Sequence, residues 1–573
     1  MPIDQLFTFK MGGPAGFGIK SVGLAFSKVA TRSGYWTYDY SEYPSLIRGG
    51  HNMVQVTIGT EPVHFTTRHT NFLMALNQET VEFYKSELAP GSGILFDGMS
   101  GIKPESLEGV DAFDVPLVQI ARDAGGEDVM RNTVAMGASL ALLGGDLEIF
   151  KVLISEEFGD KKKDVIEGNH KAAQAGYDYA KEHYKDKIKD VLKKQAKVEE
   201  KIVLTANEAA AFGAVAAGLG LVAIYPMTPT SNILHILAPL QEKYGFVYKQ
   251  PEDEIAAILM AIGAANTGLR TMVATSGGGF ALMSEAYGLA GLTETPVVII
   301  EGMRGGPATG LPTWTEQGDL RFVLHAHQSD FPRIVLAAGD GEEMFHLTMR
   351  AFNLAEKYQT PVVILMDKII CEDNQSYKPF EYGEYSVNRG KFVPGKQEDF
   401  KRYQLSDDGV SPRSRFGSGN FFIANADEHD EYGFASEEGE NRNKQMNKRM
   451  KKLATCRAED MQAPVLYGPE EAEVTLVSWG SNKGAILEAM KDLPNVNYLH
   501  ITWMNPFPAE AVAERLNKAN YLINIEQNYT AQMGGLIRER TGVAILDNLL
   551  KYDGRPIYPE EIIEKVREVT LLR

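Results

Sequence analysis

The stretch that decides the fold runs from Ile224 to Arg304. It contains, in order, the segments IYPMTPTS (224–231), QPEDEIAAILMAIGAANTG (250–268), ATSGGGFALMSE (274–285) and VVIIEGMRGG (297–306). Each segment begins or ends where a short apolar strand meets a turn, which is typical of a parallel α/β sheet. Because open α/β sheets bind ligands at the carboxyl ends of their strands, we expect the polar residues of these turns to gather along one edge.

Two of these turns carry polar side chains suited to a binding site. Thr228 lies between Pro226 and Pro229 on a rigid turn, which presents its hydroxyl instead of burying it. Glu254 begins a helix whose later positions include many small residues: Ala256, Ala257, Ala261, Gly263, Ala264 and Ala265. The dipole of a helix favours a carboxylate in its first turn, so an acid with a purely structural role is the alternative there.

The other two turns carry glycines and an arginine. Gly277 and Gly278, followed by Gly279, allow the backbone to approach a bound group where the next helix begins. Arg304 follows the last strand and brings a guanidinium to the same edge. Such a group suits bidentate recognition of a carboxylate, although a surface salt bridge is the plain alternative.

Taken together, YPMTP, QPEDE, TSGGG and RGGPATGLPT resemble the pyrimidine-side thiamine domain of the 2-oxoacid:ferredoxin oxidoreductases, in the type of α subunit that carries a fused N-terminal γ domain. The resemblance is strongest to members that act on 2-oxoglutarate. It extends over nearly the whole chain and implies a multidomain α/β protein. Its parts would be a γ, or catalytic-lid, domain (1–190), a doubly wound pyrimidine-binding thiamine domain (191–373), an inter-domain arm (374–465) and a transketolase C-terminal-like domain (466–573).

The resemblance also implies a reaction. It is the CoA-dependent oxidative decarboxylation of a 2-oxo acid with reduction of ferredoxin, which can run in reverse as a reductive carboxylation. Glu254 would hydrogen-bond the aminopyrimidine ring of thiamine diphosphate, with Gly277 and Gly278 beside the cofactor. Thr228 and Arg304 would contact the carboxylate and keto oxygen of the substrate, holding it for reaction.

The loop SLIRGGHN (45–52) bears on the choice of substrate. From the residues alone it is a solvated turn, but the resemblance implies that Arg48 meets the far end of the substrate. A second carboxylate needs such a cation, because a buried and unpaired carboxylate is costly. We therefore expect 2-oxoglutarate to be converted to succinyl-CoA and CO₂. The alternatives are pyruvate or another 2-oxo acid and, outside this chemistry, a non-catalytic scaffold or nucleotide-binding subunit.

Composition limits the classes of protein and of partner. The 573 residues are 44% hydrophobic and 23% charged, and the net charge of -18 argues against nucleic-acid binding. We find neither a membrane-spanning apolar run nor a signal peptide, so we expect a cytoplasmic protein. Two cysteines cannot bind an iron–sulfur cluster. The resemblance implies a β subunit that carries the [4Fe–4S] cluster, Mg²⁺ and most of the thiamine diphosphate contacts, ferredoxin as a further partner, and an (αβ)₂ assembly.

Two further patterns suggest metal sites that we do not assign. Gly339-Asp340-Gly341 is similar to the start of the thiamine metal signature, but only Asp367 follows at a suitable distance, so a strand-to-helix turn is the better interpretation. His325 and His327 have no third ligand nearby in the sequence. We expect no metal in this chain, and an ordered arm that packs on a neighbouring subunit in preference to a flexible linker.

Overall fold

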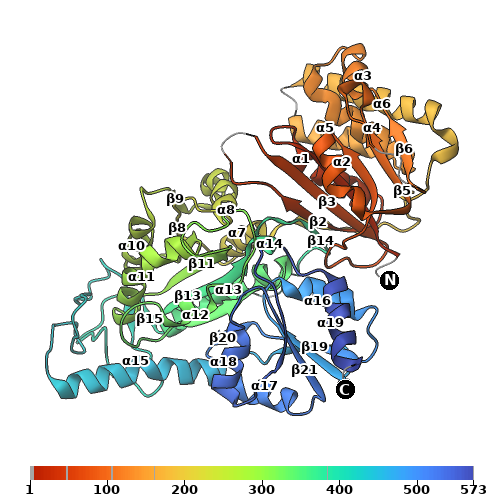
Figure 1. Ribbon diagram of the computed structural model, residues 1–573. Helices are drawn as coiled ribbons and strands as arrows, with labels where there is room; N and C mark the ends of the chain where they lie inside the picture. The colour runs from red at the N-terminus through yellow and green to blue at the C-terminus, as the bar shows by residue number, and fades with distance from the viewer. Residues whose placement is uncertain are drawn as a thin grey trace.

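The structure, a computed structural model, describes residues 5–46, 49–104, 108–159, 162–381, 383 and 385–571. Three large sheets, which we call the N-terminal, central and C-terminal sheets, each pack against helices (Figure 1). Most of the segment that the sequence assigns to an arm, 374–465, lies beside the central sheet and includes the long helix α15 (Gly439–Glu459), while its first strand, β14 (Gln375–Tyr377), belongs to the N-terminal sheet. This arrangement confirms the multidomain α/β fold class.

The N-terminal sheet has the strand order β6-β5-β4-β1-β3-β2-β14-β7. One face packs against α1 and α3 to α6, and residues of the other face share an apolar core with α16 and α19 of the C-terminal part. The elements are β1 (Phe7–Pro14), α1 (Ile19–Arg32), β2 (Trp36–Glu42), β3 (His51–Gly59), β4 (Thr70–Ala75), α2 (Gln78–Tyr84), β5 (Leu88–Phe96), β6 (Asp111–Asp114), α3 (Leu117–Asp123), α4 (Arg131–Leu142), α5 (Leu147–Phe158), α6 (Lys163–His183), β7 (Ile202–Leu204) and β14 (Gln375–Tyr377).

The central sheet has the order β20-β12-β13-β11-β10-β8-β9, in which every neighbouring pair is parallel except β12 with β20. Successive side chains along its strands point into two buried cores on opposite faces of the sheet. One core is shared with α7 and α13, and the other with α10 and α11. Helices on both faces make the sheet doubly wound. The elements are α7 (Ala206–Ala216), β8 (Leu221–Ala223), α8 (Ser231–Leu237), α9 (Gln241–Tyr244), β9 (Val247–Lys249), α10 (Glu254–Asn266), β10 (Thr271–Thr275), α11 (Gly277–Leu292), β11 (Val297–Met303), α12 (Leu320–His325), β12 (Ile334–Ala337), α13 (Gly341–Tyr358), β13 (Pro361–Asp367), α14 (Lys368–Glu372) and β20 (Trp503–Asn505).

The sheets exchange strands across the expected boundaries. β7 and β14, which lie beyond residue 190, extend the N-terminal sheet through β2, while β20 joins the central sheet. Buried polar contacts fasten the first of these junctions. Lys368 donates to the carbonyl of Ser41 at 2.7 Å, and Asp373 accepts from the hydroxyl of Tyr38 and the amide of Ser41 at 3.3 Å each. The N-terminal sheet is therefore held to the helix that follows β13.

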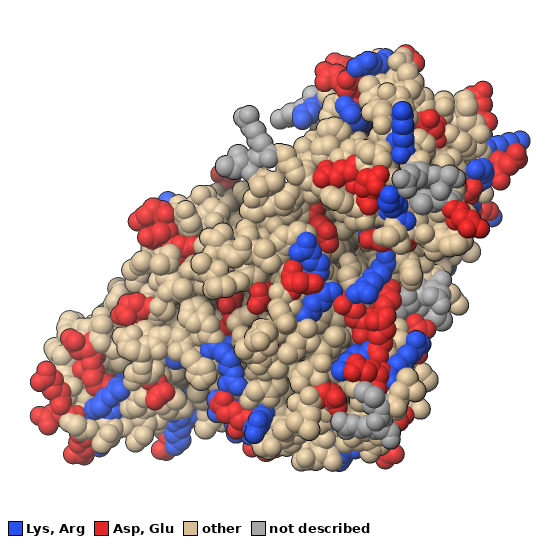
Figure 2. Space-filling view, viewed as in Figure 1, with Lys and Arg blue, Asp and Glu red and all other residues tan. Residues whose placement is uncertain are grey.

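The C-terminal sheet has the order β17-β19-β18-β21-β22. Its elements are β17 (Val465–Tyr467), β18 (Val474–Ser478), α16 (Asn482–Met490), β19 (Val496–His500), α17 (Ala509–Leu516), β21 (Tyr521–Glu526), α18 (Gln532–Thr541), β22 (Asp547–Leu550) and α19 (Pro559–Leu571). Figure 2 shows basic and acidic side chains next to one another along the line where the three sheets meet. Among the described residues, no helix combines the length and apolar character that crossing a bilayer requires.

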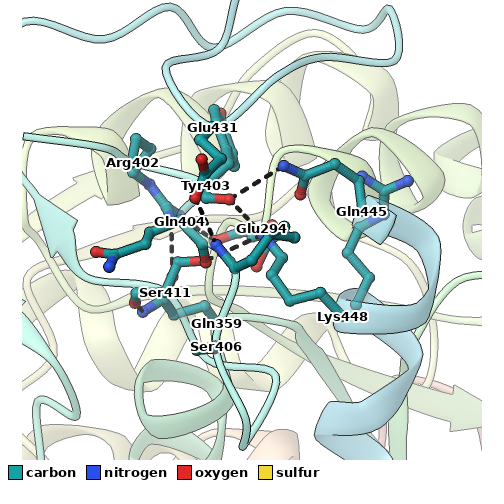
Figure 3. Close-up of polar contacts among 12 residues, drawn as sticks. Glu294, Gln359, Arg402, Tyr403, Gln404, Ser406, Ser411, Glu431, Gln445 and Lys448 are labelled. Atoms are coloured by element: carbon teal, nitrogen blue, oxygen red, sulfur yellow. Dashed lines mark hydrogen bonds and ion pairs between the residues drawn. The ribbon is translucent and has the colours of Figure 1, made fainter. Parts of the chain in front are cut away.

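The arm is ordered and anchored on its own chain by buried charges. Lys448 and Lys452 of α15 each lie 2.6 Å from a carboxylate oxygen of Glu294, and all three side chains are almost fully buried. Figure 3 shows Lys448 reaching from α15 towards Glu294 and Tyr403. Although burial alone would raise the pKa of Glu294, the two lysines and Arg402 hold it well below its usual range. The arm's contact with a neighbouring subunit stays a prediction.

Candidate functional site

The four segments of the fold-deciding stretch end at one edge of the central sheet. β11, β10, β8 and β9 are consecutive parallel neighbours, with Thr275 paired to Glu301 and Val273 paired to Ala223. Thr228, Glu254, Gly277 and Arg304 follow these strands, so all four lie at their carboxyl ends. This is the arrangement that the sequence predicts, and it is where α/β sheets bind ligands.

Thr228 and Arg304 are in direct contact. The guanidinium Nη1 of Arg304 donates to the carbonyl oxygen of Thr228 at 2.8 Å, which ties the turn after β8 to the turn after β11. Both residues are half-buried. Burial lowers the pKa of Arg304, and the nearby Asp319 carboxylate opposes that shift. The other N–H groups of Arg304 can serve an anionic ligand at this edge.

Glu254 is the buried member of three consecutive acids. Glu252 is exposed, and Asp253 accepts from the amide of Ala256 at 2.7 Å as the cap of α10. Glu254 is only 2% exposed, and within the described chain its Oε1 has no hydrogen-bond partner. A buried oxygen without a donor is costly, which indicates that a group outside the described chain supplies one.

The three consecutive glycines at the start of α11, Gly277 to Gly279, have different surroundings. A Cβ on Gly279 would lie 2.6 Å from Oε1 of Glu254, and one on Gly277 would collide with a carboxylate oxygen of Asp319. Gly278 is exposed, and its nearest neighbour for such a Cβ is the carbonyl of Ala308 at 4.0 Å. Space therefore remains open above Gly278, while the other two glycines make room for acidic side chains.

Three residues of this edge were missed by sequence reasoning. Gly279 was quoted only as the third glycine of its run, and Glu301 and Asp319 were not singled out at all. Glu301 lies in β11 and is fully buried, and Asp319 precedes α12. Glu301 was detectable as a lone acid within the apolar run VVIIEGM, whereas no sequence pattern pointed to Asp319.

The patterns that suggested a metal have structural roles. Asp340 caps α13 by accepting from the amide of Glu343 at 2.8 Å, and it pairs with Lys483 at 2.5 Å, so this motif is a strand-to-helix turn. Asp367 accepts from Ser481 and Gln317. In the described part of the chain, no group of three or more His, Cys, Asp or Glu side chains is placed to hold a metal ion.

The histidine pair and the loop before β3 complete the list of candidates. His325 is exposed, and His327 lies 3.6 Å from Glu285. Arg48, the candidate for the far end of the substrate, lies outside the described residues, so its role stays a prediction. His51, three positions after Arg48 in the sequence, begins β3, and its side chain is largely buried.

Comparisons with known proteins agree with this geometry. Residues 212–448 match the family model described as pyruvate flavodoxin/ferredoxin oxidoreductase, thiamine diphosphate-binding, and residues 8–179 match the model described as pyruvate ferredoxin/flavodoxin oxidoreductase. The 2-oxoacid:ferredoxin oxidoreductase subunit alpha of Saccharolobus solfataricus is 33% identical over 98% of this chain and 97% of its own length. The 2-oxoglutarate synthase subunit KorA of Methanothermobacter thermautotrophicus is 33% identical over 64% of this chain and 98% of its own.

A solved structure extends the comparison to the whole fold. The 2-oxoglutarate:ferredoxin oxidoreductase of Magnetococcus marinus, with 2-oxoglutarate, coenzyme A and succinyl-CoA bound, matches with a TM-score of 0.92 and 31% identity. The match covers 98% of this chain and 99% of that one. An identity of this level over the full length confirms the resemblance carried by the four motifs. The chain belongs to the α subunits of the 2-oxoacid:ferredoxin oxidoreductase family.

Proposed function

We propose that the chain is the α subunit of a CoA-dependent 2-oxoglutarate:ferredoxin oxidoreductase, which converts 2-oxoglutarate to succinyl-CoA and CO₂ and reduces ferredoxin in a reversible reaction. The choice of substrate is supported by the name of the KorA relative and by the molecules bound in the Magnetococcus marinus enzyme. The full-length relatives carry the general name 2-oxoacid, so the competing substrates are pyruvate and other 2-oxo acids.

The observation that carries the proposal is the buried Glu254 carboxylate, whose Oε1 lacks a partner within the described chain. Thiamine diphosphate suits this place, because the ring nitrogen of its aminopyrimidine can share a proton with a carboxyl group. When bound, the cofactor supplies the carbon nucleophile that reacts with the keto group. Glu254 would hold a proton at the ring nitrogen, and the exposed Gly278 would leave room for the ring beside α11, whereas Gly277 faces Asp319.

The substrate would be oriented by the pair that the structure brings together. Arg304 is fixed by the Thr228 carbonyl and keeps further donors for the carboxylate next to the keto carbon. The Thr228 hydroxyl would donate to the keto oxygen as charge develops on it. Arg48 would meet the second carboxylate of 2-oxoglutarate, which pyruvate does not have.

A β subunit would complete the site. Both cysteines, Cys371 and Cys456, are buried, so the [4Fe–4S] cluster that ferredoxin reduction needs would come from that partner, together with Mg²⁺. The apolar side chains Ile255, Leu259 and Met260 of α10, the helix that Glu254 begins, are 43%, 44% and 43% exposed. Such a patch next to an incomplete site suits a protein partner. We propose an (αβ)₂ assembly that shares the thiamine site and uses CoA as co-substrate.

The test is reduction of methyl viologen by the purified αβ complex, with CoA and a panel of 2-oxo acids. We expect 2-oxoglutarate to give the highest kcat/KM, and Arg48→Ala to lower the value for 2-oxoglutarate while sparing any activity on pyruvate. A complex that prefers pyruvate would refute the substrate assignment. A chain that forms no complex with a cluster-bearing partner and reduces no acceptor would instead support a scaffold or nucleotide-binding subunit.

A further inference from the structure

The turn that carries Thr228 is held from a second side, by Asn207 of α7. The amide nitrogen Nδ2 of Asn207 donates to the carbonyl oxygen of Pro229 at 2.9 Å, and both residues are buried. The preceding carbonyl, that of Thr228, accepts from Arg304 at 2.8 Å. The two peptide groups on either side of Pro229 are therefore fixed by side chains from α7 and from the loop after β11.

The turn packs tightly against β11. A Cβ on Gly302 of that strand would lie 2.6 Å from Cγ2 of Thr230 and 3.1 Å from Cγ of Pro229. Thr230 is fully buried, and its amide and hydroxyl each donate to the carbonyl of Met227 at 3.0 Å. The turn thus rests on β11 on one side, and Asn207 supplies a contact from α7.

The helix that carries this donor is a firm support. Thr205 and Glu208 form a capping box at its start. Further along, a Cβ on Gly213 would lie 2.7 Å from the carbonyl oxygen of Phe345 and 3.1 Å from Cβ of Thr348, so α7 and α13 pack closely. α7 also lies beside α8, the helix that follows the turn (Figure 1). A hydrogen bond donated from the first turn of such a helix gives the Thr228 turn a fixed point of reference.

Asn207 is an unusual residue for its position. It is fully buried in a helix made largely of alanine, and within the described chain its Oδ1 has no hydrogen-bond partner. A buried polar oxygen without a donor costs free energy, and asparagine is a poorer helix former than alanine. The hydrogen bond to Pro229 is the one that its side chain makes among the described residues. These features favour a role in shaping the turn over a role in stabilising the helix.

We infer that Asn207 is a positioning residue for Thr228. The inference rests on the proposed function, because it takes Thr228 as the donor to the keto oxygen. Within the described chain nothing hydrogen-bonds the Thr228 hydroxyl, so the backbone of the turn sets its direction. Asn207 and Arg304 fix that backbone at consecutive carbonyls, and in this way they aim the hydroxyl at the substrate.

Loss of the Asn207 donor should lower kcat more than it raises KM. Without this hydrogen bond the turn shifts, and the Thr228 hydroxyl no longer meets the keto oxygen on which charge develops. We expect Asn207→Ala to lower kcat about tenfold and to leave KM for 2-oxoglutarate within about threefold, because Arg304 still meets the carboxylate.

The experiment is a double-mutant cycle, measured as methyl viologen reduction by the purified αβ complex with CoA. In Thr228→Val the hydroxyl is already absent, so adding Asn207→Ala should lower kcat by less than about twofold more. Thr348→Ala is the matched control. It removes a buried hydroxyl of α13, beside α7, whose hydrogen bond goes to Met344 of its own helix at 2.7 Å, and it should keep the wild-type kcat.

The outcomes are distinct. Losses that multiply in the double variant would overturn the inference, and so would an equal fall in kcat for Thr348→Ala, since weaker packing of α7 would then explain both. If Asn207→Ala fails to assemble, Asn207→Asp gives the test with a side chain of the same shape. Its carboxyl group can donate to Pro229 only while it is protonated, so its kcat relative to wild type should fall as the pH rises, and a constant ratio would refute the role.

Failure of the proposed function would look different. A wild-type complex that turns over no 2-oxo acid would refute that function itself. Wild-type kcat in Asn207→Ala, with normal turnover of 2-oxoglutarate, would refute only the role of Asn207.

Discussion

The replacement of Glu254 by glutamine tests the site most directly. The side chain is 2% exposed, and Oε1 has no partner within the described residues, so the amide of the same shape breaks no hydrogen bond to that atom. Asp253, which caps α10, is untouched. We therefore expect the free energy of unfolding to change by no more than about 1 kcal/mol.

The effect on turnover should be far larger. A glutamine cannot exchange a proton with the aminopyrimidine ring, and a positioned acid or base contributes about 10²- to 10⁴-fold to a rate. This factor corresponds to an increase in the activation free energy of roughly 3 to 5 kcal/mol. Because Thr228 and Arg304 stay in contact, the loss should appear in kcat and leave KM for the 2-oxo acid within about threefold.

The assay is methyl viologen reduction by the αβ complex, and Glu252→Gln is the matched control. Glu252 is an exposed acid two positions away, so its replacement changes the net charge equally without reaching the site. Thermal unfolding and co-purification with the β subunit verify that both variants assemble. If Glu254→Gln keeps more than about a tenth of the wild-type kcat, the proton-handling role assigned to this residue is wrong.

Three further predictions concern the arm, pH and the partner. Glu294→Gln leaves the buried ammonium groups of Lys448 and Lys452 in α15 without their carboxylate partner, so the arm should lose about 3 to 5 kcal/mol of stability and be cut faster in limited proteolysis. The control Glu440→Gln, which replaces an exposed acid of the same helix, should be cut at the wild-type rate. Burial raises the pKa of Asp373 to about 7, so the stability that this acid contributes is full below its unfolded pKa near 3.9 and is lost as the pH rises to about 7. The melting temperature of Asp373→Asn should therefore rise relative to that of the wild type as the pH increases across that window, and a difference that stays constant would contradict the assignment. Leu259→Asp should abolish co-purification of the β subunit, while Leu546→Asp, at an exposed site of the C-terminal part, should not. If both variants retain the β subunit equally, α10 is not part of the interface.

The shared edge of the central sheet could be predicted because it depends on local patterns. A short apolar strand followed by a polar turn and a helix defines each unit, and parallel strands place their carboxyl ends together. The position of Thr228, Glu254 and Arg304 at this edge follows from these local patterns. The contact between Arg304 and the Thr228 carbonyl joins two turns 76 residues apart, and only the packed sheet brings it about.

Other contacts left no local trace. Glu301 and Asp319 are separated by a glycine-rich loop, and their proximity depends on how that loop folds back over α11. The anchor of the arm joins Glu294 to Lys448, 154 residues later, within a helix whose sequence reads as a charged and solvated surface. Buried lysines contradict the usual pattern of burial, so composition alone could not reveal them.

The amino-acid sequence by itself determined the α/β class and the order of the strand-to-helix units, because periodicity and turn chemistry act over a few residues. Its four motifs indicated the family by resemblance and the sheet edge at which the candidate site lies. Only the tertiary structure decided which strands cross between sheets, as β7, β14 and β20 do, and that Arg304 meets the carbonyl of Thr228. Those features depend on side chains that meet across long stretches of chain, where packing and desolvation select the partners and no short pattern encodes them.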